Sequence, residues 1–155
     1  MLSEVLSEER NKEELINKDK ISVNYKRIRK IDENIPNGFK NIQKLYLCHN
    51  YVDNLENIEL FPNLVHLSVA YNHLFDIEEL THVQNRDKIQ CLSVKGNFFQ
   101  KHPNYKKLLI NYFPKYHSRH FLFSFFLSLK ELDGKAITQY MRSIIKGIRY
   151  LVLKS

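Results

Sequence analysis

Histidine and cysteine are the side chains of this sequence with the types and spacing that could bind a metal or act as a nucleophile. His66 and Cys91 hold the same place in two successive copies of an apolar pattern, so they should be neighbours on adjacent strands. A structural or catalytic zinc needs three or four ligands, and no third partner for this pair is evident. The segment His117–His120 likewise offers only two ligands. We therefore expect no metal site.

Sequence motifs of catalysis are also missing. The chain contains no glycine-rich phosphate loop, no His-Glu-x-x-His helix and no Cys-x-x-Cys pair. We therefore expect a non-catalytic protein without a cofactor, for which turnover that vanished on substitution of Cys91 or His66 would be contrary evidence.

Repeats organise the elements that position these residues. In the stretch 42–52 the pair Leu45-x-Leu47 alternates with the period of a strand, and Asn50 then turns the chain inward. A buried asparagine can satisfy backbone groups of neighbouring turns, which an apolar side chain cannot. The same spacing returns around Asn72, with Leu64, Leu67, Val69 and Leu74, and around Asn97, with Ile89, Leu92, Val94 and Phe99.

A degenerate first copy precedes these three, at residues 21–31, with Lys26 in place of the asparagine. The anchors at 26, 50, 72 and 97 are separated by 24, 22 and 25 residues. Periods of about 20 to 29 residues with this pattern indicate leucine-rich repeats. Phe39 and Phe61 each lie three residues before the next repeat begins, where we expect them to fill the core between layers.

The sequence also resembles a known family. The stretch 64–80 matches LxxLxLxxNxIxxIxxL, the pattern of short intracellular leucine-rich repeats of the phosphatase-regulator type. Segments 97–105, 108–110, 113–114 and 129–134 resemble the C-terminal cap of that class, which is similar in ciliary and centrosomal repeat proteins and in the spliceosomal A-prime subunit. The resemblance implies an α/β solenoid: a right-handed arc with a short parallel concave sheet, an N-terminal helix and a C-terminal cap.

Four segments follow from this reading. We predict an N-terminal capping helix over 1–20, for which an acidic binding helix is the alternative, and repeats with the start of the cap over 21–114. Residues 115–128 form an atypical apolar insertion, interpreted either as an extra element packed on the cap or as an unspliced intron translated in frame. The end of the cap and a basic amphipathic helix occupy 129–155, the helix packing on the cap or binding a membrane surface or partner.

Composition agrees with a single intracellular domain. No apolar run approaches the length of a transmembrane helix, and the acidic start of the chain does not resemble a signal sequence. Cys48 and Cys91 should lie two strands apart, beyond disulfide reach, so we expect free thiols. The net charge of +7 favours an acidic partner, which charge alone leaves open as nucleic acid, an acidic protein tail or a membrane surface.

The candidate binding residues are those between the core positions. Because side chains alternate along a strand, every second residue should point onto the concave face, and others should form an aromatic ridge beside the asparagines. Tyrosine and arginine are enriched in binding hot spots. The alternative is that these tyrosines only stack on one another along the repeats, which would give the same sequence pattern. The concave candidates are Lys44, Tyr46, Cys48, His66, Ser68, Ser93 and Lys95, and the ridge candidates are Tyr25, His49, Tyr51, Tyr71, His73 and Phe98.

These features predict a protein-binding scaffold or adaptor. The resemblance implies a cytoplasmic role in a cytoskeletal, ciliary or centrosomal assembly, and the positive charge favours an acidic protein as partner. Assembly into a nuclear ribonucleoprotein, with RNA as a further partner, is the alternative that the spliceosomal resemblance and the positive charge permit.

Overall fold

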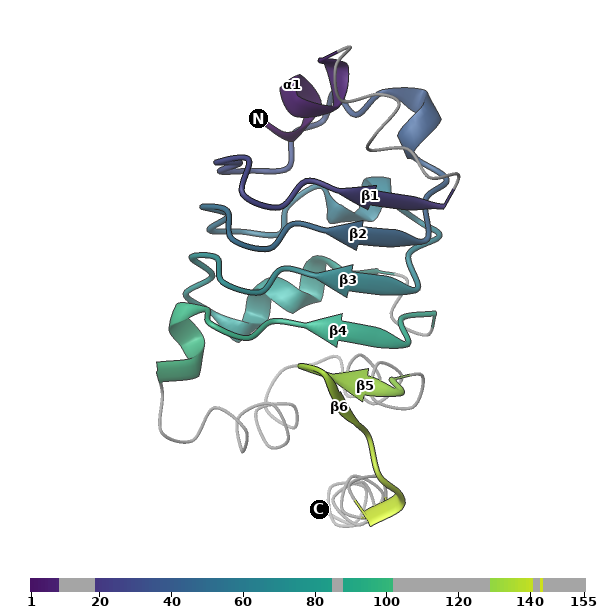
Figure 1. Ribbon diagram of the computed structural model, residues 1–155, viewed down its shortest axis with the longest axis vertical. Helices are drawn as coiled ribbons and strands as arrows, with labels where there is room; N and C mark the ends of the chain where they lie inside the picture. The colour runs from purple at the N-terminus through teal and green to yellow at the C-terminus, as the bar shows by residue number, and fades with distance from the viewer. Residues whose placement is uncertain (9–18, 85–87, 102–128, 141–142, 144–155) are drawn as a thin grey trace.

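A single open sheet runs through the part of the chain that the computed structural model describes, residues 1–8, 19–84, 88–101, 129–140 and 143. Its strands follow one another in chain order, β1 to β6 (Figure 1). The first five are parallel, and the last is antiparallel to its neighbour. The bounds are β1 Lys20–Ser22, β2 Lys44–Tyr46, β3 His66–Ser68, β4 Cys91–Ser93, β5 Glu131–Leu132 and β6 Lys135–Ala136.

Register aligns the repeated leucines. Leu45 lies opposite Leu67, and Leu67 lies opposite Leu92, so each apolar side chain packs directly on its counterpart in the next turn. All three are buried. Since each turn buries its apolar face against its neighbours, the core is a continuous column through the stack. The repeat periods and the solenoid arc predicted from the sequence are confirmed.

Buried asparagines join each turn to the one before it. The side-chain oxygen of Asn50 accepts hydrogen bonds from the backbone N–H groups of Lys26 (2.9 Å) and Ile28 (3.0 Å), and its amide donates to the carbonyl of Val23 (2.9 Å). The oxygen of Asn72 accepts from Val52, and that of Asn97 accepts from Leu74. The predicted role of these asparagines is confirmed.

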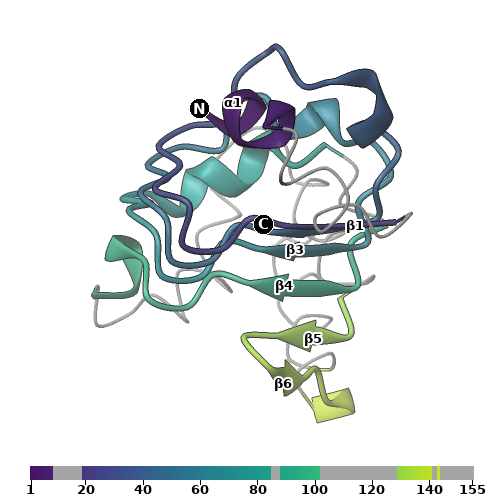
Figure 2. The same cartoon turned by 45° about the horizontal axis from the view of Figure 1, so that its top comes forward.

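Among the described residues, three short 3-10 helices lie on the side of the arc opposite the strands, and a fourth follows β4 at the edge of the sheet (Figure 2). They deliver Phe39 and Phe61 into the core, where both rings are buried as predicted. Helices of this length, three to six residues, keep each return between strands short, which suits repeats of 22 to 25 residues. Their bounds are η1 Asn37–Phe39, η2 Ile58–Leu60, η3 Ile77–His82 and η4 Phe98–Lys101.

Helix α1, Leu2–Ser7, lies across the N-terminal end of the stack (Figure 1). Leu2 and Leu6 are buried in the same core as the strands. Asp32, in the return after β1, accepts a hydrogen bond from the backbone N–H of Ser3 (3.0 Å) and so caps the first turn of α1 from outside the helix. Residues 9–18, the rest of the predicted capping helix, lie outside the described residues, and the four-segment division stays a prediction.

A β-hairpin closes the described C-terminal end. Both turn residues have positive φ, 52° at Asp133 and 76° at Gly134, as a two-residue type I′ turn requires. Within the segment 129–155 the predicted basic helix therefore does not begin directly after the cap motif 129–134, because Lys135–Ala136 forms β6. The Asp-Gly dipeptide was the signal for this hairpin. The insertion and most of the basic helix fall on residues outside the described ranges.

Candidate functional site

Two rows of outward-pointing side chains cross the concave face. In the first row Lys20, Lys44, His66, Cys91 and Glu131 are successive register partners. The predicted neighbours His66 and Cys91 do lie side by side. In the second row the register partners are Ser22, Tyr46, Ser68 and Ser93.

Charge changes sign along the first row. The ammonium of Lys44 forms a 2.7 Å ion pair with Asp19, which raises the pKa of Lys44 and lowers that of Asp19. At the other end Glu131 is exposed and lies beside Cys91. The row therefore runs from lysines on β1 and β2, the second of them paired with Asp19, to a glutamate on β5 that has Lys130 beside it in the chain.

The two candidate reactive groups are held in their neutral forms. Burial lowers the pKa of His66, and the nearby Lys44 and Lys20 act in the same direction against Glu131. Burial also raises the pKa of the Cys91 thiol, and Glu131 adds to that increase. A neutral thiol is a poor nucleophile. In the described ranges no three His, Cys, Asp or Glu side chains gather in a way that could hold a metal ion.

Tyr46 is the aromatic centre of this face. Its ring lies 4.8 Å from the ring of His66, centroid to centroid, and the ammonium of Lys20 lies 4.9 Å from its centroid. Such a cation above an aromatic face is attracted to it electrostatically. Tyr46 is half-buried, so part of its ring and edge stays available on the concave surface.

Ser68 does not offer the contact expected of it. Although Ser68 shares a face with Tyr46, it is only 6% exposed. Its hydroxyl lies 2.9 Å from the sulfur of Cys48, and neighbouring side chains cover it. A small side chain between larger neighbours on a sheet is shielded from solvent even when it points away from the core. Cys48 and Cys91 are free cysteines, as predicted.

Aromatic rings form a first column along one end of the strands. The rings of Tyr25 and His49 are stacked with centroids 4.4 Å apart and planes 9° apart, and His49 and Tyr71 repeat this at 4.4 Å and 11°. All three residues have φ between 55° and 59°. This left-handed backbone, repeated at one site of each turn, aims the side chains in the same direction. Gly96 occupies the corresponding place in the fourth turn.

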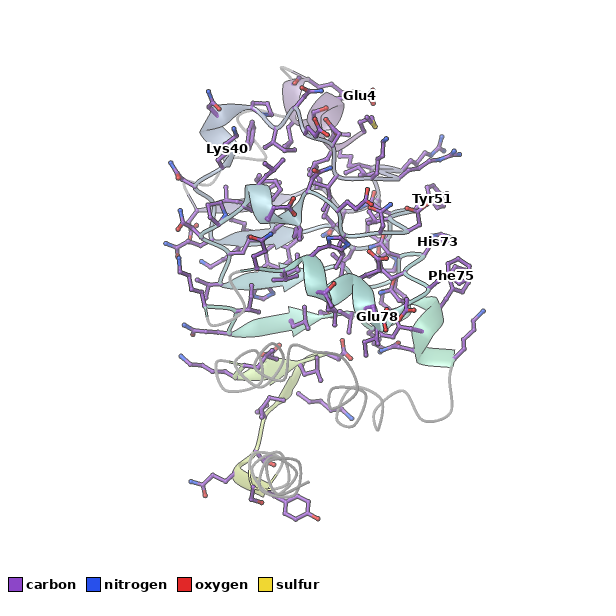
Figure 3. The ribbon with its side chains drawn as sticks, turned by 180° about the vertical axis from the view of Figure 1, so that it is seen from behind. Glu4, Lys40, Tyr51, His73, Phe75 and Glu78 are labelled. Atoms are coloured by element: carbon purple, nitrogen blue, oxygen red, sulfur yellow. The ribbon has the colours of Figure 1, made fainter. Side chains whose placement is uncertain are left out.

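A second column runs two residues further along each turn, with Tyr51, His73 and Phe98. Tyr51 and His73 have ring centroids 5.4 Å apart, and His73 and Phe98 have centroids 5.3 Å apart. Phe75, which the sequence interpretation missed, stacks on Phe98 at 4.5 Å. Figure 3 shows Tyr51, His73 and Phe75 in succession down one edge of the molecule.

The two columns together make the aromatic ridge, which we define as Tyr25, His49, Tyr71, Tyr51, His73, Phe98 and Phe75. Tyr25 and Phe75 are each 71% exposed, and Tyr51 is 49% exposed. His73 is half-buried, and its Nδ1 is buried without a hydrogen-bond partner. The ridge brings all six predicted ridge residues together and adds Phe75, while Glu131 is an addition on the concave face. The sequence signal for Phe75 was an aromatic residue two positions after His73.

Comparisons with known proteins can be set beside this geometry. No protein-family model matches the chain. A curated relative, the "Acidic leucine-rich nuclear phosphoprotein 32-related protein" of Plasmodium falciparum (isolate 3D7), is 32% identical over 82 residues. The match covers 52% of this chain and 29% of the relative, so the chain spans less than a third of that protein's length.

Solved structures resemble the chain in fold. A chain of the Drosophila melanogaster SNF/U2A' complex matches with a TM-score of 0.55 and 18% identity over 86% of each chain. The Chaetomium Mex67:Mtr2 subunits match with a TM-score of 0.45 and 23% identity, over 70% of this chain and 66% of that one. In the described ranges no helix is both long and apolar enough to cross a membrane. The chain shares its fold with the first of these structures, and its parallel strands and repeat spacing are those of a leucine-rich repeat solenoid.

Proposed function

We propose that this chain is a non-catalytic scaffold that binds a protein partner through its concave face and aromatic ridge. The observation that carries the proposal is the ridge, because aromatic rings exposed in a continuous run reduce solubility unless a partner covers them. Tyrosine supplies apolar area and a hydroxyl at a small cost in conformational entropy, which suits a binding hot spot.

Rigidity supports the same proposal. The first column is fixed by ring stacking and by a repeated left-handed backbone, and backbone N–H groups of His49 and Tyr71 donate to carbonyls of the next turn. A surface that is already ordered loses little conformational freedom on binding. The positive end of the concave face, at Lys20 and Lys44, suits an acidic segment of that partner.

A ribonucleoprotein subunit is the second candidate. It is favoured by the likeness in fold to a chain of a structure named as a SNF/U2A' complex. The relative is named a nuclear phosphoprotein, which favours a nuclear location. The phosphatase-regulator class and the cytoskeletal, ciliary or centrosomal role expected from the sequence find no support in either comparison, so we place the scaffold in a nuclear assembly.

Partner capture with a matched control tests the proposal. The partner would be identified by affinity capture and mass spectrometry, purified, and titrated against the full chain and the double variant Tyr46→Ala/Tyr51→Ala. We expect at least a tenfold loss of affinity, since a hot-spot side chain contributes about 2 kcal/mol or more. Tyr140→Ala removes a tyrosine that is 73% exposed outside the ridge and should change nothing.

Stability must be measured in parallel. Tyr51 is exposed and Tyr46 half-buried, so the double variant should unfold within about 1 kcal/mol of the parent. A folded double variant that binds the purified partner with unchanged affinity would rule out this surface.

A further inference from the structure

The N-terminal end of the ridge combines a free aromatic face with concentrated positive charge. The stacked rings that the structure describes end at Tyr25, whose neighbour in the column is His49. With 71% of Tyr25 exposed, the ring face away from His49 is open to solvent. A planar group placed there would continue a stack whose members are already 4.4 Å apart.

Four basic residues lie within five positions of the chain directly after this ring. Lys26, Arg27, Arg29 and Lys30 are all exposed. The acids of the same turn are Asp32, which is buried and hydrogen-bonded to Ser3 and Asn34, and the exposed Glu33.

The middle turns carry the opposite charge. Residues 45–84 include six acids, Asp53, Glu56, Glu59, Asp76, Glu78 and Glu79, and contain neither lysine nor arginine. An anionic ligand would therefore be directed away from the middle of the ridge and toward its ends. At the other end the ammonium groups of Lys95 and Lys101 already lie over the rings of Tyr71 and Phe98, whereas the ring of Tyr25 is 71% exposed.

Arg27 replaces an aromatic residue at this end. In the repeat it aligns with Tyr51 and His73, but its φ of 57° is left-handed, as at Tyr25, whereas theirs is not. An exposed aromatic ring and a planar cation therefore lie two residues apart in the chain. Arginine binds phosphate through two parallel hydrogen bonds, which lysine does not.

The segment that carries these groups is held in place before any ligand arrives. The side-chain oxygen of Asn50 accepts hydrogen bonds from the backbone N–H groups of Lys26 and Ile28, and the N–H of Tyr25 donates to the carbonyl of Cys48. Fixing the backbone on both sides of Arg27 orders the loop before binding, which reduces the entropy that binding must overcome.

We propose that this end of the ridge binds single-stranded nucleic acid, with a base stacked on Tyr25 and phosphates held by Arg27, Arg29 and the adjacent lysines. Sequence-tolerant single-strand binders combine these two elements, an aromatic platform and a positive path for the backbone. An acidic peptide would satisfy the charges but would leave the open ring face unused. The inference shares Tyr25 with the ridge proposed above as a protein-binding surface, but its test uses neither Tyr46 nor Tyr51.

Fluorescence anisotropy with labelled decamers of uridine, of deoxythymidine, and of a mixed-sequence DNA duplex tests the proposal on the full chain. We expect both single strands to bind more tightly than the duplex, whose bases are already stacked; the RNA and DNA arms show whether the ribose matters. Tyr25→Leu, which keeps bulk but removes the ring, should weaken single-strand binding by about fivefold or more. Its far-UV circular dichroism should match the parent.

Charge variants supply the second arm. Arg27→Gln/Arg29→Gln should weaken binding and reduce the slope of log affinity against log salt by about 1.4, since each single-strand phosphate contact contributes about 0.7. Lys40→Gln/Lys88→Gln removes the same charge elsewhere; Figure 3 shows Lys40 near the opposite edge from Tyr51. This control should bind within about twofold of the parent, a change small enough to separate it from the test pair.

Two results would overturn the proposal. The first is that the parent binds no decamer measurably, or that Tyr25→Leu and Arg27→Gln/Arg29→Gln bind the single strands with the affinity of the parent. The second is that a polyglutamate decamer displaces the labelled single strand as well as an unlabelled single strand does, and does so equally in the parent and in Tyr25→Leu. That result would assign the basic segment to an acidic protein instead. Unchanged partner affinity in the Tyr46/Tyr51 variant would overturn the protein-binding surface and leave this site standing, so the two proposals fail separately.

Discussion

The ring of Tyr71 lies directly on the backbone of Gly96, where an added Cβ would come within 2.4 Å of Cδ1 of that ring. Gly96 also has a φ of 76°, in the left-handed region. The first aromatic column therefore ends on a residue without a side chain, which lets Tyr71 fold down over the fourth turn beside Lys95, whose ammonium lies 5.9 Å from the ring centroid.

Gly96→Ala should destabilise the chain and displace Tyr71. The left-handed backbone alone costs an alanine about 1 to 2 kcal/mol, and the contact with the ring adds to it. Urea unfolding followed by far-UV circular dichroism would measure this, because the chain lacks tryptophan. Gly38→Ala is the matched control, since a Cβ there meets nothing within 4 Å. Equal stability of the two variants would contradict the contact.

Asn50→Ala should lower the free energy of unfolding much more than a typical surface substitution does. It would leave the N–H groups of Lys26 and Ile28 and the carbonyl of Val23 without their present partner. Each buried polar group left unpaired costs about 1 to 3 kcal/mol, so we expect a loss of about 3 kcal/mol or more. Hydrogen exchange would show the amides of Lys26 and Ile28 exchanging faster. Asn54→Ala, in an exposed hydrogen bond to Asp53, should be nearly neutral. Unchanged exchange rates at both amides would contradict the hydrogen bonds from Lys26 and Ile28 to Asn50.

Asp32→Asn should destabilise the chain in a pH-dependent way. Burial acts to raise the pKa of Asp32, but hydrogen bonds from Ser3 and Asn34 outweigh it and leave the pKa below its usual value. A lowered pKa in the folded state means that the carboxylate stabilises the fold above about pH 4, and that this is lost as pH falls through the folded pKa.

The difference between parent and Asp32→Asn should therefore be about 1 kcal/mol at pH 7, the size of a lost helix cap, and smaller at pH 3. Urea unfolding at both pH values gives the comparison. Glu33→Gln changes the adjacent exposed acid and should show neither effect. A difference that stayed constant from pH 7 to pH 3 would mean that the charge of Asp32 is not what holds α1.

Cys91 should react slowly with iodoacetamide. Its raised pKa leaves less thiolate at a given pH than an ordinary cysteine has. In a Cys48→Ser variant, the alkylation rate of Cys91 measured from pH 7 to 10 should have its midpoint above that of the same chain unfolded in urea. Glu131→Gln should move that midpoint downward, because the carboxylate contributes to the shift. A midpoint at or below the unfolded value would contradict this assignment.

How far the sequence predicts this structure can be judged at individual residues. The register of Leu45, Leu67 and Leu92 follows from strict spacing, because shifting any strand by one residue would expose its leucine. The place of Tyr25, His49 and Tyr71 beside the asparagines follows from the same spacing. Their face-to-face stacking does not, since it depends on three left-handed φ values that no residue type in this group demands.

Other features required contacts that spacing cannot supply. Leu67 lies mid-stack and Ile21 at its end, which predicts a larger loss for Leu67→Ala, yet both are fully buried because α1 covers the end. We expect each alanine variant to lose about 2 to 5 kcal/mol. Exposure of Ser68 was overestimated for a similar reason, since its neighbours cover it. The fifth strand was missed because a long interval separates it from the repeats.

That interval has a consequence for how the chain folds. Ile21, Leu45, Leu67 and Leu92 succeed one another after 24, 22 and 25 residues, but Leu132 pairs with Leu92 only after 40. Loop-closure entropy grows with the logarithm of loop length, so the longer step costs about 0.4 kcal/mol more than a normal repeat. Low contact order favours fast assembly of the first four strands, with β5 joining afterwards. Segments of quite different length could therefore connect β4 to β5 with little effect on the free energy of unfolding. A change in that length should alter the folding rate, and first of all the rate of the step that adds β5.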